Sequence, residues 1–274
     1  MLGALIGEVF GTFILILLGD GVVANVGLAP RLASPGYNWN TITFGWAFAV
    51  IVAVYVSAGV SGAHINPAVT IALALKRNFS WGLVVPYILA QMVGAFLGAL
   101  GVYLCYRDGL VAAGMPNVWS TGPGSVFGTA FWGGTGAESA GAFSFTTALI
   151  TEIIGTAVLM WGILASGDQR NNGLVNNMGP FLVGGTVLSI GLSLGGPSGY
   201  AINPARDLGP RIFGALAGTQ NLFADGYWWV PVVGPIIGGI IGIFAYDLFV
   251  SAFLPRREVA AQTPAQKEPA LVEK

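Results

Sequence analysis

One eight-residue frame occurs twice in this chain and constrains its fold more than any other feature. The frame Ser-Gly-x-x-Ile-Asn-Pro-Ala covers residues 61–68 and returns at residues 198–205. Asn is a favoured N-cap because its side-chain oxygen accepts a hydrogen bond from a free N–H of the first helical turn, and Pro is favoured at the next position. Each Asn-Pro-Ala is therefore expected to begin a helix. The two motifs are Asn66, Pro67, Ala68 and Asn203, Pro204, Ala205.

The surroundings of both motifs are too apolar for a water-soluble protein. Hydrophobic residues make up 54% of the chain and charged residues 8%, which indicates an integral membrane protein with the lipid bilayer as its surroundings. The basic residues form no patch that could follow a nucleic acid backbone. With one Cys and one His, the chain is expected to hold no metal and no internal disulfide, and no motif predicts a cofactor.

Six segments are long and apolar enough to cross a hydrocarbon core of about 30 Å, which requires about 20 helical residues. They are residues 3–28, 41–60, 82–105, 144–166, 178–195 and 229–253. Two shorter apolar segments, 66–76 and 203–216, follow the Asn-Pro-Ala motifs and reach only about half of that thickness at 1.5 Å per residue. We therefore expect an all-α membrane protein with six transmembrane helices and two re-entrant half-helices.

The two halves of the chain repeat each other. Glu8-Val-Phe-Gly-Thr in the first span matches Glu152-Ile-Ile-Gly-Thr in the fourth. Each half contains three crossings, so the second half enters the membrane from the opposite side and the repeat is inverted. We expect one domain over residues 1–254. It divides into a first repeat (3–105), an external connection (106–143) and a second repeat (144–254), and a disordered cytoplasmic tail follows (255–274).

Basic residues predict the orientation, because cytoplasmic loops of membrane proteins carry an excess of Lys and Arg. One side has Lys76, Arg77, Arg170, Arg256, Arg257, Lys267 and Lys274, whereas the other has Arg31 and Arg107 apart from the arginines of the second half-helix. Both termini are therefore expected in the cytoplasm.

Charged residues inside the apolar segments are candidate functional residues, because such groups are unfavourable in lipid. Arg206 is expected to face a cavity, and Asp207 to pair with Arg211 at the helical spacing i, i+4. Glu8 and Glu152 are expected to accept hydrogen bonds from the irregular backbone before each half-helix. His64 is either a pore-lining group or a brace for its neighbours.

A further motif, Gly19-Asp-Gly-Val-Val-Ala24, imitates a dinucleotide-binding fingerprint. No strand precedes it, and it lies at the end of a predicted membrane helix, so we interpret it as a chance match.

The two motifs in an inverted repeat, residues 62–70 and 199–207, resemble the aquaporin or major intrinsic protein family, over about residues 3–254. The resemblance implies six tilted helices with two half-helices, assembled as a homotetramer with one pore per subunit. Asp207 directly after Asn-Pro-Ala-Arg is similar to the glycerol-facilitator branch. The selectivity filter implied by position is Trp46, Gly191, Tyr200 and Arg206. That branch usually has Phe at the position of Tyr200, which leaves the choice of solute open.

The resemblance implies a passive channel for small uncharged solutes, chiefly glycerol, with water and small neutral acids such as lactic acid as further permeants, and with exclusion of protons and ions. The alternative is an alternating-access secondary transporter, which also uses inverted repeats and broken helices. Such a transporter needs a coupling-ion site, for which the paired Glu8 and Glu152 are the main intramembrane acids. An enzyme is not expected, because the sequence has no nucleophile–base motif.

Overall fold

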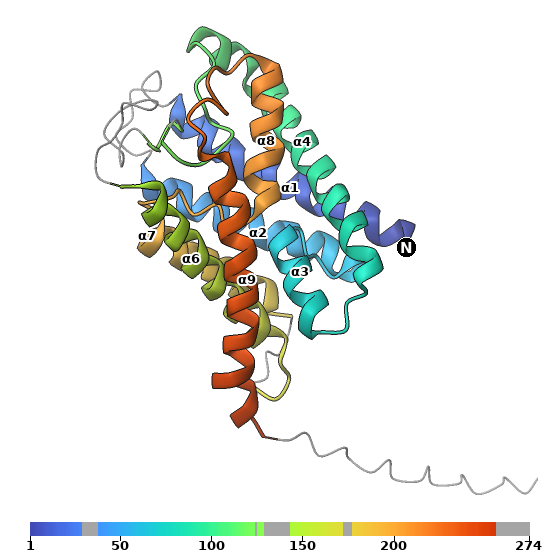
Figure 1. The fold of residues 1–274 in the computed structure, drawn as a ribbon. Helices are drawn as coiled ribbons and strands as arrows, with labels where there is room; N and C mark the ends of the chain where they lie inside the picture. Colours follow the sequence, from blue (N-terminus) through green and yellow to red (C-terminus); the bar gives the residue numbers. More distant parts are fainter. Residues whose placement is uncertain (29–37, 124, 129–142, 172–176, 256–274) are drawn as a thin grey trace, which may run out of the picture.

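The computed structural model describes residues 1–28, 38–123, 125–128, 143–171 and 177–255. Regular secondary structure in these residues is entirely helical (Figure 1). The helices in chain order are α1 (Leu2–Gly27), α2 (Trp39–Ser61), α3 (Pro67–Lys76), α4 (Trp81–Ala112), α6 (Phe145–Gly167), α7 (Gly179–Leu194), α8 (Pro204–Ala217), the short η2 (Tyr227–Trp229), α9 (Val230–Phe249) and the short η3 (Ser251–Phe253). The expected order of long helices and two half-helices is confirmed.

Five helical segments are long and apolar enough to cross a membrane: α1, α2, α4, α6 and Tyr227–Phe253, which contains α9. The remaining expected span, residues 178–195, corresponds to α7, which is apolar but has 16 residues in the structure. At 1.5 Å per residue it is about 24 Å long, somewhat shorter than the hydrocarbon core. Helix α4, in contrast, continues to Ala112, beyond the expected end at residue 105. Arg107 and Asp108 are exposed and still helical, since charged residues can continue a helix beyond the apolar segment.

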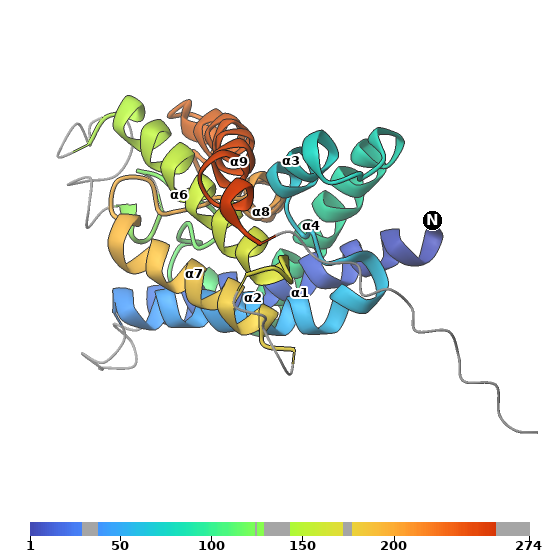
Figure 2. The same cartoon turned by 90° about the horizontal axis from the view of Figure 1, so that it is seen from below.

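The half-helices α3 and α8 begin near the centre of the molecule and run in opposite directions (Figure 1). Each has Pro at its first position and an Asn immediately before it, as the motif predicts. Both half-helices lie against α4 and α9, and the view from below shows α3 beside α9 (Figure 2). The inverted repeat therefore brings the two Asn-Pro ends to the same central place.

Small residues allow the longer helices of each repeat to pack closely. A Cβ on Gly98 of α4 would lie 2.7 Å from the Phe13 carbonyl oxygen of α1. In the second repeat, a Cβ on Gly238 of α9 would overlap the Ile153 carbonyl of α6. Close approach through small residues is a usual way for membrane helices to associate. The pairs α1–α4 and α6–α9 are thus equivalent supports for the centre.

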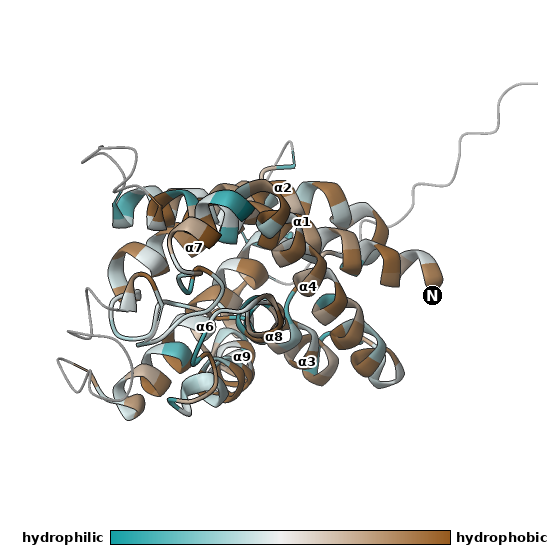
Figure 3. Cartoon of the chain, turned by 90° about the horizontal axis from the view of Figure 1, so that it is seen from above, coloured by the Kyte–Doolittle hydropathy of each residue, from teal (hydrophilic) through white to brown (hydrophobic). Residues whose placement is uncertain are grey.

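The outer faces of the helices carry large apolar side chains, and hydrophobic residues run along most of each helix (Figure 3). Exposed examples are Phe10, Phe48, Leu89, Leu104, Ile150, Trp161, Ile241 and Phe244. Contiguous apolar surface of this kind suits contact with lipid rather than water. Many of the polar and charged side chains are instead buried in the interior of the molecule.

The connection between the repeats was expected at residues 106–143, and only part of it lies within the described residues. Its described part folds onto the second half-helix: Trp119 is fully buried, and its indole N–H donates to Thr219 Oγ1 at 2.9 Å. Residues 129–142 and the expected tail, from residue 256 onwards, lie outside the described residues.

Candidate functional site

The two asparagines of the repeated motif cap their half-helices. Asn66 Oδ1 accepts a hydrogen bond from the Ala68 N–H at 2.9 Å. Asn203 Oδ1 accepts from the Ala205 N–H at 3.0 Å and from the Arg206 N–H at 3.3 Å. These bonds satisfy N–H groups that a helix leaves free at its start. The amide nitrogens are therefore directed away from their own helices.

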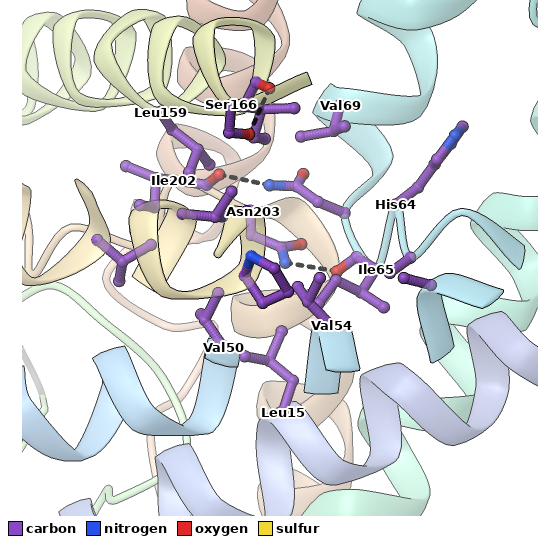
Figure 4. A pocket seen from close by; sticks show the side chains of 18 of the residues that line it. Leu15, Val50, Val54, His64, Ile65, Val69, Leu159, Ser166, Ile202 and Asn203 are labelled. Carbon is purple, nitrogen blue, oxygen red and sulfur yellow. Dashed lines mark hydrogen bonds between the residues drawn. The ribbon is translucent and has the colours of Figure 1, made fainter. Parts of the chain in front are cut away.

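Each amide nitrogen donates to the backbone of the opposite repeat. Asn66 Nδ2 donates to the Ile202 carbonyl and Asn203 Nδ2 to the Ile65 carbonyl, both at 2.8 Å (Figure 4). One donor of each amide is therefore used within the protein. Since a side-chain amide has two N–H donors, one on each asparagine remains for a passing molecule.

The loops before the half-helices adopt an unusual backbone. Four non-glycine residues have positive φ, at equivalent positions in the two repeats: Ala63 (50°), Ile65 (42°), Tyr200 (39°) and Ile202 (46°). Left-handed backbone is uncommon outside glycine, and it persists only where the surroundings fix it. These loops therefore need support from elsewhere in the molecule.

Glu8 supports the first loop. Its carboxylate accepts from the His64 N–H at 2.9 Å and from the Ile65 N–H at 2.7 Å. Ser61 Oγ and Gln91 Nε2 donate to the same carboxylate at 2.7 Å each. Gln91 was missed by sequence reasoning, although a single polar residue in the third apolar span was a usable signal. A buried carboxylate with four donors is a structural anchor.

Glu152 supports the second loop in the equivalent way. It accepts from the Ala201 N–H at 2.8 Å and from the Ile202 N–H at 2.6 Å. Gly11 and Gly155, which follow the two glutamates by three residues, allow the loops to approach their helices. A Cβ would lie 2.8 Å from the Ile65 side chain at Gly11 and 3.1 Å from the Ile202 side chain at Gly155. The repeated Glu-x-x-Gly pattern is therefore a loop-holding device.

His64 acts as a brace and also lines the central cavity. Its Nδ1 lies 3.1 Å from Thr70 Oγ1, and its ring packs against Phe79 and Tyr87 with centroid distances of 4.6 and 5.1 Å. Gln91 Nε2 also donates to Thr70 Oγ1, at 2.9 Å. Both roles considered for this residue are thus compatible with its position.

A cavity of about 310 Å³ passes the two asparagines. One end is lined by Trp46, Tyr200 and Arg206, and the other by residues at the end of α6 and the start of α7. Between them, one wall is apolar and the other is formed by the two loops. The apolar residues are Leu15, Val50, Val54, Val69, Leu159, Val183 and Val187 (Figure 4 labels the first four and Leu159). The cavity thus offers hydrogen-bonding groups along one side and apolar contact along the other.

Three of the four residues assigned to the filter line this cavity, and the fourth lies against one of them. The Arg206 guanidinium stacks over the Trp46 ring at 3.9 Å from its centroid. Gly191 does not line the cavity, but a Cβ there would lie 2.8 Å from Tyr200 Cζ and 2.8 Å from Thr43 Cγ2. Because Gly191 has no side chain, the Tyr200 ring can occupy this position.

Trp39 also contacts this part of the filter, and no pattern in the sequence predicts that contact. Its indole N–H donates to the Gly191 carbonyl at 3.0 Å, and its ring meets the Tyr200 ring edge-on at 5.6 Å. The position of Tyr200 is consequently fixed from two sides.

Arg206 and Asp207 have different partners. Arg206 Nη1 lies 3.5 Å from Asp20 Oδ1 of α1, a pairing that the sequence did not suggest. Asp207 pairs with Arg211 at 2.7 Å, as its spacing predicts, and also accepts from the N–H and Oγ1 of Thr121 at 2.7 Å each. Asp207 therefore ties the connection between the repeats to α8.

Basic residues gather at the end of the molecule where α3 and α9 finish. Lys76 and Arg77 both pair with Asp247, the lysine at 3.4 Å. Arg170 pairs with Asp168 and donates to Ser251 Oγ, each at 2.7 Å. Three cations of the predicted cytoplasmic side are thus at one end; Arg31 and the four basic residues of the tail lie outside the described residues.

Comparison with known proteins agrees with this architecture. A family model described as "Major intrinsic protein" matches residues 1–246. A glycerol uptake facilitator protein of Streptococcus pneumoniae is 44% identical over 257 residues, which are 91% of this chain and 100% of the relative. A glycerol uptake facilitator protein of Bacillus subtilis is 43% identical over 247 residues, 88% of this chain and 82% of the relative.

A solved structure has the same fold. The X-ray structure of the aquaglyceroporin from Plasmodium falciparum superposes with a TM-score of 0.79 at 32% sequence identity, over 92% of this chain and 97% of that one. The chain therefore belongs to the major intrinsic protein family, as a multi-pass membrane channel with the aquaporin fold rather than an enzyme.

Proposed function

We propose that this channel conducts glycerol, with water as a second permeant. The observation that carries the proposal is the cavity whose polar side holds two asparagine amides and whose filter end combines two aromatic rings with one guanidinium. Glycerol has hydroxyl groups along one edge and C–H groups along the other, so it matches both sides. The two facilitator proteins to which the chain is similar carry glycerol in their names.

Each of the four proposed filter residues makes a different contribution to glycerol binding. Trp46 and Tyr200 offer apolar surface to the carbon edge of glycerol, and Arg206 donates to its hydroxyl groups. Gly191 leaves the space that a larger side chain would remove. At the centre, the remaining N–H of Asn66 and of Asn203 donates to the hydroxyl oxygens. A solute that leaves its hydration shell thus exchanges water contacts for fixed donors, the usual basis of channel selectivity.

Ions and protons are excluded by the same arrangement. The N-termini of α3 and α8 meet at the centre, and each helix N-terminus carries about half a positive elementary charge. Arg206 adds a positive group at the filter end. Cations therefore meet an unfavourable field, as in the aquaporin type of pore. Neutral lactic acid is a further proposed permeant because it is small and uncharged, whereas its anion must leave water in a largely apolar passage.

The proposed orientation has both termini in the cytoplasm, supported by the cluster of Lys76, Arg77 and Arg170 at one end. The proposed assembly is a homotetramer with one pore per subunit, supported by the family resemblance. Native mass spectrometry in detergent tests the assembly, and accessibility of an engineered C-terminal tag in right-side-out vesicles tests the orientation.

Stopped-flow light scattering on proteoliposomes tests the function. Flux that rises in proportion to the glycerol gradient, without saturation and without a proton gradient, supports a channel. Saturable uptake coupled to protons would instead support the alternating-access transporter. Comparing glycerol, water and lactic acid across pH ranks the three permeants, since lactic acid flux through the channel should follow the neutral fraction.

Replacing Arg206 by alanine is expected to relax the filter. Loss of the guanidinium widens the cavity and removes its positive charge, so flux of a four-carbon polyol such as erythritol should rise about tenfold, equivalent to about 1.4 kcal/mol. Flux of protons, followed with an entrapped pH dye, should rise as well. Exposed Arg107 serves as the matched control, Arg107→Ala. Unchanged selectivity would remove Arg206 from the filter.

Replacing Tyr200 by phenylalanine is expected to favour glycerol over water. The Tyr200 hydroxyl is buried and has no hydrogen-bond partner among the described residues, so its removal breaks no hydrogen bond with them. The glycerol-to-water permeability ratio should rise by about two- to threefold, less than the roughly tenfold or more that one methylene group contributes in a close-fitting pocket. Tyr103→Phe, at a ring that packs against Phe213 instead, is the control. A lower ratio would show that the hydroxyl itself serves glycerol.

A further inference from the structure

Asp20 is a buried acid that the proposed function leaves unused. It lies on α1 within the segment that imitates a dinucleotide-binding fingerprint, and its side chain has no exposed surface. It does not line the cavity. Neither carboxylate oxygen has a hydrogen-bond partner among the described residues. A buried acid without hydrogen bonds is unfavourable, so its place next to a cation needs an explanation.

That cation is Arg206. The ion pair joins Asp20 Oδ1 to Arg206 Nη1 at 3.5 Å, and Nη1 has no hydrogen-bond partner within the described part of the chain. The arginine side chain is 8% exposed and that of Asp20 0%. The pair is therefore screened little by water.

The neighbouring Gly19 brings Trp46 into the same arrangement. A Cβ on Gly19 would overlap the Trp46 ring, so the ring packs directly on the α1 backbone. The Arg206 guanidinium stacks over that ring at 3.9 Å from its centroid. Gly19 and Asp20 thus act together: the glycine seats the ring, and the carboxylate attracts the guanidinium that lies over it. The segment that imitates a dinucleotide-binding fingerprint therefore contributes two residues that contact the filter.

We infer that Asp20 is a positioning residue for selectivity, which holds Arg206 over Trp46 and balances its charge at the filter. This inference rests on the proposed function. Without the carboxylate, the guanidinium keeps its positive charge but loses the group that holds it at the wall. It then turns toward the cavity to find hydrogen-bond acceptors, and it narrows the passage for a polyol more than for water.

The test uses Asp20→Asn, which preserves the size of the side chain and removes its charge. Per reconstituted channel, glycerol permeability should fall about fivefold and water permeability less than about twofold, within the range expected for residues in direct contact. The same substitution at exposed Asp108, Asp108→Asn, is the matched control and should leave both unchanged. A glycerol-to-water ratio equal to that of the unaltered channel in Asp20→Asn would overturn the inference.

A second background separates positioning from general damage to the fold. When Arg206→Ala is already present, Asp20→Asn should leave the permeability ratio within about twofold, because no guanidinium remains to be held. The change in melting temperature that Asp20→Asn causes in detergent should have opposite signs in the two backgrounds. Asp20→Asn lowers the melting temperature of the unaltered channel but raises that of Arg206→Ala, since it removes an uncompensated buried charge. An equal effect of Asp20→Asn in both backgrounds would overturn the inference.

The two proposals can fail separately. If the unaltered channel conducts water but no glycerol, the proposed function is wrong. The melting temperatures of the four proteins then still show whether Asp20 and Arg206 are coupled, and coupling without any change in permeability would overturn the selectivity role.

Discussion

Replacing Glu152 by leucine is expected to abolish solute flux and to destabilise the protein strongly. The carboxylate accepts from the Ala201 and Ile202 N–H groups, directly before the second half-helix. Without it, two buried donors lose their acceptors, at about 1–3 kcal/mol each, and two residues with positive φ lose their support. The expected loss is therefore about 2–6 kcal/mol. Thermal unfolding in detergent and stopped-flow flux measure the two effects.

Two variants serve as comparisons for Glu152→Leu. Glu152→Gln keeps one oxygen acceptor, so its thermal stability and solute flux should lie between those of the unaltered channel and those of Glu152→Leu. Thr151→Leu makes a similar apolar change one residue earlier, where the side chain lies outside the buried centre, and should behave as the unaltered channel. Normal flux and stability in Glu152→Leu would contradict the anchoring role of the carboxylate.

Replacing Gly191 by leucine is expected to abolish glycerol flux while some water flux remains. Even a Cβ at this position would lie 2.8 Å from Tyr200 and from Thr43, so the larger side chain must displace the tyrosine ring toward the cavity. We expect glycerol permeability to fall at least about tenfold, which corresponds to about 1.4 kcal/mol in the barrier. Proteoliposome flux of glycerol and water measures the effect.

Gly185 of the same helix is the matched control. A Cβ there meets nothing within 4 Å, so Gly185→Leu introduces the same side chain into open space on α7. It should leave the permeability ratio unchanged. Equal losses in Gly185→Leu and Gly191→Leu would show that α7 tolerates no large residue, and the specific role of Gly191 would then be wrong.

The helices and their order could be predicted from the sequence because both depend on local patterns. Apolar length identified the spans, and the Asn-Pro pair identified the starts of α3 and α8. The end of α4 was predicted too early, since charged residues at a membrane boundary do not end a helix. The bonds of Asn66 and Asn203 to their own helices were predictable for the same local reason.

The contacts that shape the site were only partly predictable. The capping asparagines and the two loop-holding glutamates could be proposed because each repeat carries them in the same place. The pairing of Arg206 with Asp20 could not, because it joins residues on different repeats and neither spacing nor repetition relates them. The same holds for Trp39 at Gly191 and for Thr121 at Asp207. These contacts depend on how the helices cross, which a one-dimensional pattern does not contain.

The exchanged bonds between Asn66 and Ile202, and between Asn203 and Ile65, have a consequence for how the molecule is made. During synthesis the first half enters the bilayer before the second half exists. The Asn66 amide and the Ile65 carbonyl then lack their hydrogen-bond partners in surroundings that offer little water. The second half satisfies both at once when it arrives. Neither half is therefore complete by itself, and assembly is completed when the two repeats exchange these bonds at the centre of the molecule.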